Sequence, residues 1–478
     1  MHSEGALVGT SEPAQSGALP GAKRVIVVLL VCILPRLILF GLVRPWSPRV
    51  EAQAILQGDA AEYHQLAITM LERHRFLDGA TGRPEAIRTP IYPLLVASTY
   101  FLFGYRPWVV LLVQIIIDTF SCFLLLLTLS RNLDRRSAIA GSLFYALDPF
   151  LIMYCSRLLS DVLNVCFLVA ALYLFGAAMT ARSRRTSLSY YAACGLFTGL
   201  AALVRPISQY LPLILVAVIF VSSRRQPEKA LKYSAAYLLA AVLALSPWIA
   251  RNCATFGSCS LSTSGSYNLL VLNIAPMEMV RHHQDAETVR KMLLSEAGEM
   301  MAADGLRQDE VSPFQEAKYL NRLAARYIKS DPLLFGKIYL LGVFHTLFSV
   351  DSAGYARLLG LPQASFDIKA YASIIALFKA FVSKKGATGL LIAGLIAPYL
   401  LVSYFCAIVG LVVSWRRYDR CLLWLSLVVA VYFVLVTGAA GTARFKLPSI
   451  PFYLVFAGSG ANWLFERIRS KPVRRDLA

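Results

Sequence analysis

The chain has 478 residues, of which 57% are hydrophobic and only 16% are charged, and its mean hydropathy is +0.59. Soluble domains carry about a quarter charged residues, so this composition excludes an ordinary water-soluble fold. The formal net charge of +19 comes from Lys and Arg residues that cluster at the ends of long apolar runs. Membrane orientation accounts for that placement, and we therefore expect no nucleic-acid partner.

The first 22 residues are rich in Gly, Ser, Pro and Ala and predict a disordered cytoplasmic tail. Lys23 and Arg24 then precede an apolar run that we interpret as an uncleaved signal anchor. Lipid offers no partner for backbone polar groups, so apolar runs of this length predict helices and not strands. We predict spans at about 24–43, 107–130, 137–155, 162–181, 189–203, 206–222, 231–250, 390–414, 421–437 and 447–465.

The sequence therefore predicts an all-α polytopic membrane protein with about ten transmembrane helices, within a range of about nine to thirteen. The connections richest in Arg and Lys belong on the cytoplasmic side by the positive-inside rule, which requires an even number of spans. These connections are 131–136, 182–185, 224–232, 416–420 and 467–475.

Two further apolar runs, 333–350 and 366–382, carry polar interruptions. His345 lies in the first run, and Lys369 and Lys379 lie in the second. We interpret both runs as interfacial or re-entrant helices that do not cross the membrane.

This topology divides the chain after its tail. Residues 23–250 form a membrane domain whose large first extracytoplasmic loop is 44–106. Residues 251–387 form an extracytoplasmic loop region with interfacial helices. Residues 388–466 supply the C-terminal transmembrane helices, and 467–478 form a basic cytoplasmic tail.

The 251–387 region contains two local features. Cys253 and Cys259 lie close together in a polar stretch, and outside the cytoplasm they can form a disulfide or remain free thiols. Residues 316–332 predict an amphipathic helix that lies along the membrane surface. Its apolar face comprises Ala317, Leu320, Leu323 and Ala324.

Polar residues follow the first span in the stretch QGDAAEYHQLA. Asp59, Glu62 and Tyr63 have i, i+3, i+4 spacing and share one face of a helix. Asp59 and Glu62 fit a helix capping box, and they equally fit a pair of carboxylates that do chemistry.

Cations recur at the outer ends of the predicted spans. Arg88 precedes a run that enters the membrane, where it is either a snorkelling anchor or a ligand for an anionic head group. Each cation alone is best explained as an anchor, but together they oppose the positive-inside trend and face the carboxylates. A lipid-linked phosphate with a nearby proton acceptor suits this pattern. The other outer cations are Arg157, Arg205, Arg251, Arg444 and Lys446.

Two further aspartates belong to predicted spans, one at the start of a span and one inside a span. Asp161 begins the fourth span, where it or Ser160 can cap the helix. Asp118 lies deep in the second span, where interhelical hydrogen bonding suits it better than surface chemistry.

The sequence resembles the bacterial dolichyl-phosphate-mannose–protein mannosyltransferase-like family. That family belongs to the GT-C glycosyltransferase superfamily, which also includes the lipid A aminoarabinose transferases. The resemblance covers about residues 24–465 and depends on the order of several short motifs. These are GDAAEYHQLA, RTPIYPLL, SRLLSD, GLAALVRP, SPWIARN, STSGSYNL and ARFKLPSIP.

The resemblance implies a first extracytoplasmic loop with two juxtamembrane helices, here at about 58–72 and 91–103. It also implies polyprenyl-phosphate sugar donors and transfer with inversion at the anomeric carbon. The first-loop acid of the family maps onto Asp59 as candidate base, and the acid after the third span maps onto Asp161. Arg88 matches the basic residue expected near the lipid phosphate.

The remaining site predictions are looser. Arg205, Arg251 and Arg444 are candidates for binding the donor phosphate. The sequence departs from the family at Asp148, which we cannot assign, and in the closing motif, where Phe445 and Lys446 follow Arg444 and a Tyr is more usual. Further candidate substrate contacts are Glu62, Tyr63, His64, Tyr92 and Lys446.

We therefore predict an inverting glycosyltransferase that moves a sugar from a polyprenyl-phosphate donor to an envelope or protein acceptor. The predicted location is a bacterial inner membrane, with the active site facing the periplasm. No cofactor is required, although paired acids can recruit a divalent metal. The alternatives are a transporter or flippase for a lipid-linked sugar, and a non-catalytic membrane partner that binds an envelope polymer.

Overall fold

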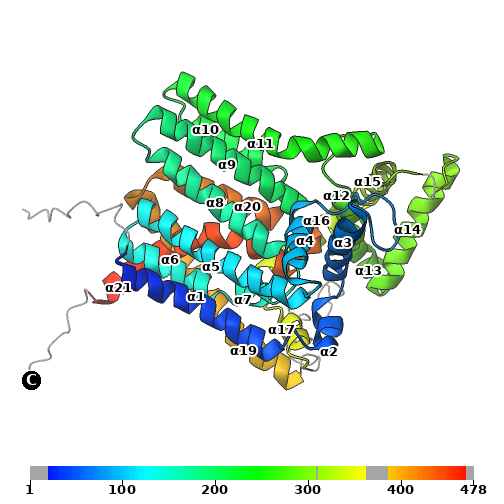
Figure 1. The fold of residues 1–478 in the computed structure, drawn as a ribbon, viewed down its shortest axis with the longest axis horizontal. Helices are drawn as coiled ribbons and strands as arrows, with labels where there is room; N and C mark the ends of the chain where they lie inside the picture. Colours follow the sequence, from blue (N-terminus) through cyan, green and yellow to red (C-terminus); the bar gives the residue numbers. More distant parts are fainter. Residues whose placement is uncertain (1–19, 308–310, 362–385, 470–478) are drawn as a thin grey trace, which may run out of the picture.

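The computed structural model describes residues 20–307, 311–361 and 386–469, and these ranges are built from helices (Figure 1). Within them, the one extended pairing is an isolated bridge between Leu77 and Pro84. The predicted all-α fold class is confirmed.

Six helices of the described chain are long and apolar enough to cross a membrane, or eight if each of two bent pairs counts as one span. The six are α1 (Ala22–Val43), α5 (Pro107–Asn132), α8 (Asp161–Met179), α9 (Arg184–Val204), α11 (Pro227–Phe256) and α19 (Gly386–Arg417). Figure 1 shows the long helices lying side by side in one bundle, with the N-terminal end of α1 and the C-terminal end of α21 (Ile450–Arg469) at the same end.

The other four predicted spans are also helical; one corresponds to α21, and the other three are short or bent. Helices α10 (Leu211–Ser222) and α20 (Arg420–Leu435) are short and apolar. Helices α6 (Arg135–Leu147) and α7 (Pro149–Cys155) meet at 48°, because Pro149 cannot continue the hydrogen-bond ladder of α6. All ten predicted runs thus form helices, while the number that crosses the membrane stays a prediction.

The run 333–350 forms α16 (Pro332–Phe348), which meets α17 (Ser352–Leu358) at 53°. Such a bend is compatible with a broken span or a re-entrant segment. The run 366–382, with Lys369 and Lys379, lies outside the described residues.

Small residues allow α19 and α21 to pack closely. A Cβ atom added at Gly410 would lie 1.8 Å from the carbonyl oxygen of Phe456, and one added at Gly460 would lie 1.9 Å from that of Cys406. Close backbone approach of this kind is a usual basis of helix association in lipid.

The buried carboxylate of Asp118 joins three helices. It accepts hydrogen bonds from the Arg36 guanidinium of α1 and from the Tyr145 hydroxyl of α6. All three side chains are fully buried. The predicted interhelical role of Asp118 is therefore confirmed, and its partner is an intramembrane arginine that we did not single out.

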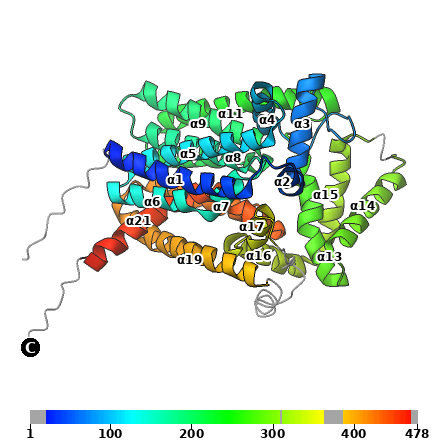
Figure 2. The same cartoon turned by 60° about the horizontal axis from the view of Figure 1, so that its bottom comes forward.

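Two helices predicted in the first loop are present as α3 (Asp59–Arg73) and α4 (Ile91–Phe103). They lie at the opposite end of the bundle from the start of α1 and the end of α21, as do the helices of the second large loop (Figure 2). Those helices are α12 (Ser264–Tyr267), α13 (Ala275–His282), α14 (Ala286–Ala303) and α15 (Pro313–Ser330).

The predicted amphipathic helix is α15, but its apolar face does not need a membrane. Leu320, Leu323 and Ala324 are buried in a small core with Leu270 and Leu293. This corrects the expectation of a helix lying on the membrane surface, because protein side chains already cover the face that lipid would have covered.

Candidate functional site

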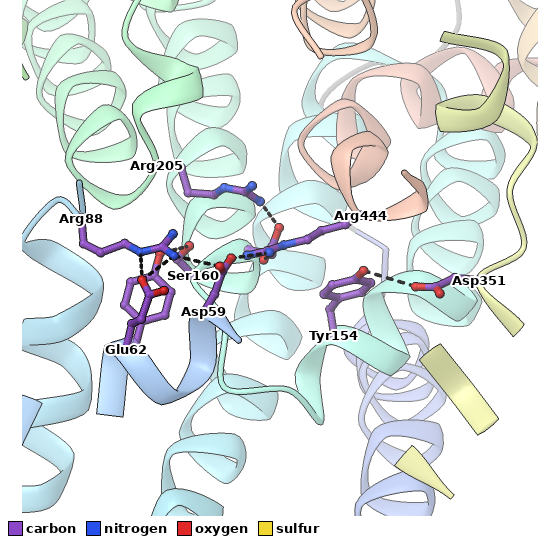
Figure 3. Close-up of polar contacts among 10 residues, drawn as sticks. Asp59, Glu62, Arg88, Tyr154, Ser160, Arg205, Asp351 and Arg444 are labelled. Carbon is purple, nitrogen blue, oxygen red and sulfur yellow. Dashed lines mark hydrogen bonds and ion pairs between the residues drawn. The ribbon is translucent and has the colours of Figure 1, made fainter. Parts of the chain in front are cut away.

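Three arginines and three carboxylates converge at the end of the bundle that carries α3 and α4 (Figure 3). They come from segments far apart in the chain, and formal charges of +3 and −3 cancel within the group. We call this group the arginine–carboxylate cluster. Its members are Asp59, Glu62, Arg88, Asp161, Arg205 and Arg444.

Asp59 is the first residue of α3, and it follows Gly58, whose φ of 58° suits glycine. The helix therefore starts one residue earlier than a capping box at Asp59 would require, and no side chain caps it. The predicted capping box is wrong. The Asp59 carboxylate is instead directed at two arginines, with Oδ1 2.8 Å from Arg88 Nη2 and Oδ2 2.6 Å from Arg444 Nη1.

These ion pairs set the protonation state of Asp59. Burial on its own would raise the pKa of this carboxyl, but the guanidiniums of Arg444 and Arg88 outweigh burial and hold the pKa well below its usual range. Asp59 is therefore ionised at neutral pH, and both of its oxygens are already bound.

Asp161 is the second carboxylate of the cluster and lies at the first position of α8. Its side chain is fully buried, and its two oxygens bind Arg205 and Arg444, the latter through Nε at 2.9 Å. Arg444 thus bridges Asp59 and Asp161. Figure 3 shows Arg88, Asp59 and Arg444 in a row, with Tyr154 and Asp351 beyond Arg444.

Arg88 precedes α4 and is held from two directions. Its guanidinium bonds Glu62 as well as Asp59, with Nη2 2.6 Å from Glu62 Oε2, and it stacks over the Tyr63 ring at 5.2 Å. Burial opposes its charge, but Tyr63, Asp59 and Glu62 raise the pKa of Arg88 further above its usual range. Arg88 is therefore a permanent cation, with its side chain still 18% exposed.

Aromatic residues line the base of the cluster. The Tyr63 hydroxyl lies 3.1 Å from Ser160 Oγ, and its ring packs edge-on against Tyr92. Tyr92 is buried, and its hydroxyl donates to Gln114 at 2.6 Å. Tyr63 and Tyr92, both predicted as substrate contacts, therefore pack against each other, and Tyr92 has no exposed surface.

His64 points away from this group. Its Nδ1 lies 2.7 Å from the Tyr100 hydroxyl. Burial lowers the pKa of His64, which keeps the imidazole neutral at physiological pH.

Two predicted cations, Arg251 and Lys446, also lie outside the cluster. Arg251 bonds the carbonyl oxygens of Glu85 and Phe76. Lys446 is buried, bonds the carbonyl oxygens of Leu347 and Ser349, and lies over the Phe150 ring at 3.6 Å. Arg251 also bonds the side-chain amide oxygen of Asn252, and neither cation contacts a carboxylate of the cluster.

Asp148, which the sequence left unassigned, caps α7. Its carboxylate accepts the backbone N–H groups of Phe150 and Leu151 and the hydroxyl of Tyr399. The Asp-Pro pair is a usual helix start, so this structural role had a local signal.

Sequence reasoning missed several neighbours of the site. Ser160 was considered only as a helix cap, and Glu85 and Tyr154 were not considered at all. The Tyr154 hydroxyl donates to Asp351 at 3.3 Å, and the Glu85 carboxylate accepts two backbone N–H groups. No local pattern marks these residues, because their partners belong to distant segments or to the backbone.

The chemistry open to the cluster follows from its charges. Guanidinium groups bind phosphate with charge-assisted hydrogen bonds, and a carboxylate beside them can accept a proton. In the described part of the chain, no group of three or more His, Cys, Asp or Glu side chains is placed to hold a metal ion. The cluster thus contains groups that can bind an anion and groups that can accept a proton.

Residues 87–250 match the sequence model of the dolichyl-phosphate-mannose-protein mannosyltransferase family. The predicted family resemblance is confirmed. The matched segment runs from just before Arg88 to just before Arg251, and it includes Asp161 and Arg205. No curated protein sequence matches the chain.

Solved structures of an archaeal oligosaccharyltransferase show the same fold. The archaeal oligosaccharyltransferase AglB from Archaeoglobus fulgidus, in complex with an inhibitory peptide and a dolichol-phosphate, matches with a TM-score of 0.52 at 14% identity over 94% of this chain. This chain spans 50% of that one. ArnT from Cupriavidus metallidurans bound to undecaprenyl phosphate has a TM-score of 0.43 at 12% identity, over 93% of this chain and 78% of that one. The likeness to AglB, at 14% identity, shows a shared fold.

Proposed function

We propose that this protein transfers a sugar from a polyprenyl-phosphate donor to an acceptor on the extracytoplasmic face of the membrane, with inversion at the anomeric carbon. The observation that carries the proposal is the convergence of Arg88, Arg205 and Arg444 on Asp59 and Asp161. The family match over residues 87–250 supports the class of reaction. A dolichol-phosphate bound to a protein of the same fold supports the class of donor.

The transfer step uses the cluster as follows. A hydroxyl or amine of the acceptor attacks the anomeric carbon from the face opposite the phosphate, and a new bond forms from that atom to carbon. The bond from carbon to the phosphate oxygen breaks, and its electron pair stays with the phosphate. Asp59 takes the acceptor proton, while Arg88 and Arg444 stabilise the charge that develops on the leaving polyprenyl phosphate.

The resting ion pairs impose a condition on this step. Asp59 cannot accept a proton readily while Arg88 and Arg444 occupy both of its oxygens and hold its pKa low. A donor phosphate competes for the same guanidiniums, and each arginine that it draws away raises the proton affinity of Asp59. Donor binding therefore activates the base, and Asp59 stays a weak base when no donor is present.

Two features support an extracytoplasmic site. A disulfide joins Cys253 and Cys259 at the end of the bundle that carries the cluster, and disulfides persist in oxidising compartments. The basic segment 182–185 lies at the start of α9, whereas Arg205 of the cluster follows the end of that helix. The positive-inside rule predicts that the basic segment is cytoplasmic. We place the site on the periplasmic side of a bacterial inner membrane.

The test is mass spectrometry of lipids that co-purify with the wild-type protein and with Arg88→Ala. We expect a polyprenyl-phosphate sugar with the wild type and its loss from Arg88→Ala. Arg83→Ala is the matched control, because Arg83 is an exposed arginine of the same loop, and it should retain the lipid. Equal retention of bulk phospholipid by all three proteins, with no polyprenyl-phosphate sugar, would contradict the proposal.

A further inference from the structure

We propose that Arg251 and the turn closed by the Cys253–Cys259 disulfide are positioning elements for Arg88. The inference rests on the proposed function, because it explains how the phosphate-binding arginine is held in place. It gives Arg251 a role that acts through Arg88, in place of the direct phosphate contact expected from the sequence.

Arg88 needs such support because it lies on an irregular segment. The chain between α3 and α4 runs from His74 to Pro90 without a helix. One internal support is Glu85, whose buried carboxylate accepts the backbone N–H groups of Ile87 and Arg88, the latter at 2.9 Å. This bond fixes the backbone of Arg88 relative to Glu85, so whatever holds Glu85 also holds Arg88.

Arg251 holds Glu85 from the end of α11. Its Nη1 donates to the Glu85 carbonyl oxygen at 2.7 Å, and its guanidinium lies 4.7 Å from the Trp248 ring and 5.0 Å from the Phe256 ring. A third ring, Phe76, lies at 5.8 Å and belongs to the Arg88 segment itself. Arg251 is therefore fixed among aromatic rings and bonded to the segment that carries Arg88.

The disulfide turns the chain back toward the same segment. Helix α11 ends at Phe256 and is capped by Gly257, whose φ is 66°, and Cys259 then bonds Cys253 in the last turn of the helix. The returning segment, residues 258–263, runs back along the helix, where Asn252 Nδ2 and Trp248 Nε1 donate to the carbonyl oxygen of Leu261. The returning segment is thus attached to α11 by one covalent bond and by side-chain hydrogen bonds.

The returning segment then bonds the residues that precede Arg88. The Thr263 backbone N–H donates to the Ala86 carbonyl oxygen at 3.0 Å, and the Ser262 hydroxyl donates to the Ile87 carbonyl oxygen at 2.6 Å. The disulfide, Arg251 and Glu85 therefore form one connected support that ends at the Arg88 backbone.

The first experiment measures amide hydrogen exchange of residues 85–88 in nanodiscs, for the wild type and for Cys253→Ser/Cys259→Ser. We expect faster exchange in the variant at Ile87 and Arg88, because the bonds from residues 262 and 263 are no longer held in register. Cys421→Ser is the matched control, since Cys421 is a free, half-buried cysteine of α20. Unchanged exchange at residues 85–88 would overturn the proposal.

The second experiment measures the affinity for undecaprenyl phosphate as the probe. Loss of the disulfide should weaken binding about five- to tenfold, and Arg251→Lys should weaken it by a similar factor, within the range that coupled neighbours show. Neither change should weaken binding further in an Arg88→Ala background, because both act through Arg88. Fully additive losses would overturn the proposal, since a general loss of structure adds to the Arg88→Ala effect.

Reduction of the folded wild type with a water-soluble phosphine covers the case in which the double-serine variant does not fold. Cys259 is exposed and accessible to the reductant. Reduction should weaken the binding of undecaprenyl phosphate by the same factor as the double-serine substitution. The two proposals also fail in different ways. Faster exchange at residues 85–88 without any binding of undecaprenyl phosphate by the wild type would reject the proposed donor while upholding the positioning of Arg88.

Discussion

At the scale of single residues, the decisive feature is that the site arginines are shared between carboxylates. Arg444 bonds both Asp59 and Asp161, and Arg88 bonds both Asp59 and Glu62. Each guanidinium is paired with a carboxylate, so the donor phosphate that we propose must displace a carboxylate in order to bind. In the proposed reaction, donor binding and activation of Asp59 are therefore linked through the same ion pairs.

Asp59→Asn tests this linkage. We expect transfer to fall by about 10²- to 10⁴-fold, the usual contribution of a general base. The affinity for undecaprenyl phosphate should rise, because the amide no longer competes as an anion for Arg88 and Arg444. Isothermal titration and a transfer assay measure the two effects. Weaker binding by the variant would show that Asp59 helps to hold the donor and does not compete with it.

Asp59→Asn also alters the dependence of stability on pH. The folded-state pKa of Asp59 is lowered, so its ion pairs contribute fully above the unfolded value of about 3.9 and are lost as the pH falls toward the folded value. Between pH 6 and pH 3, thermal unfolding should shift less in Asp59→Asn than in the wild type. Equal shifts would mean that the arginines do not depress this pKa.

Asp161 and Glu62 should differ in their effect on stability. Asp161 is fully buried between Arg205 and Arg444, and removing one partner of a buried pair costs about 3–5 kcal/mol. The Glu62 side chain is 50% exposed, and exposed pairs contribute about 0–1 kcal/mol. Thermal unfolding in detergent should thus show a large loss for Asp161→Asn and a small one for Glu62→Gln. The reverse order would contradict the burial of Asp161.

At the scale of elements, close backbone packing organises the bundle that carries the site. Helices α19 and α21 approach at Gly410 and Gly460, and α21 follows directly after the segment of Arg444. The position of α21 therefore affects the position of Arg444. Only the pairing of glycines on two helices, and not either glycine alone, produces this approach.

Gly410→Ala tests the approach. The added Cβ would lie 1.8 Å from the Phe456 carbonyl oxygen, so the helices must separate, at a cost of about 1–3 kcal/mol as for other overpacked sites. Gly394→Ala in the same helix is the control, because no atom lies within 4 Å of its added Cβ. Thermal unfolding compares the two variants, and similar melting temperatures would contradict close packing at Gly410.

At the scale of the whole molecule, α3, which carries Asp59 and Glu62, lies at the opposite end of the bundle from the start of α1 and the end of α21 (Figures 1 and 2). The Arg36–Asp118 pair lies between them and joins α1 to α5 inside the bundle. One end of the bundle is basic, and the other end carries the paired arginines and carboxylates. A membrane protein with a fixed orientation is expected to have two such different ends.

Cysteine labelling tests the orientation. In a Cys421→Ser background, a cysteine at Ala80 in the α3–α4 loop should react with an impermeant maleimide in spheroplasts. A cysteine at Gln226, between α10 and α11, should react only after the membrane is permeabilised. Labelling of Gln226→Cys in sealed spheroplasts would reverse the proposed topology.

Much of the architecture could be predicted from the sequence, because the length of an apolar run and the charges at its ends act on each segment separately. The ten apolar runs all became helices, and the juxtamembrane helices appeared at α3 and α4. The membrane-surface interpretation of α15 failed for a nonlocal reason, since a pattern reveals that a face is apolar but not what covers it. The capping box at Asp59 failed because Gly58 starts the helix from a positive φ.

The sequence by itself determined that this protein is a bundle of membrane helices with cations and carboxylates at one end, because lipid imposes its requirements on each segment separately. Only the tertiary structure decided which charges meet. Arg444 reaches Asp59 across 385 residues of sequence, while Arg251 bonds the Glu85 carbonyl oxygen and lies over the Trp248 ring. Charge pairing depends on distance and direction in space, and neither is a property of any one segment.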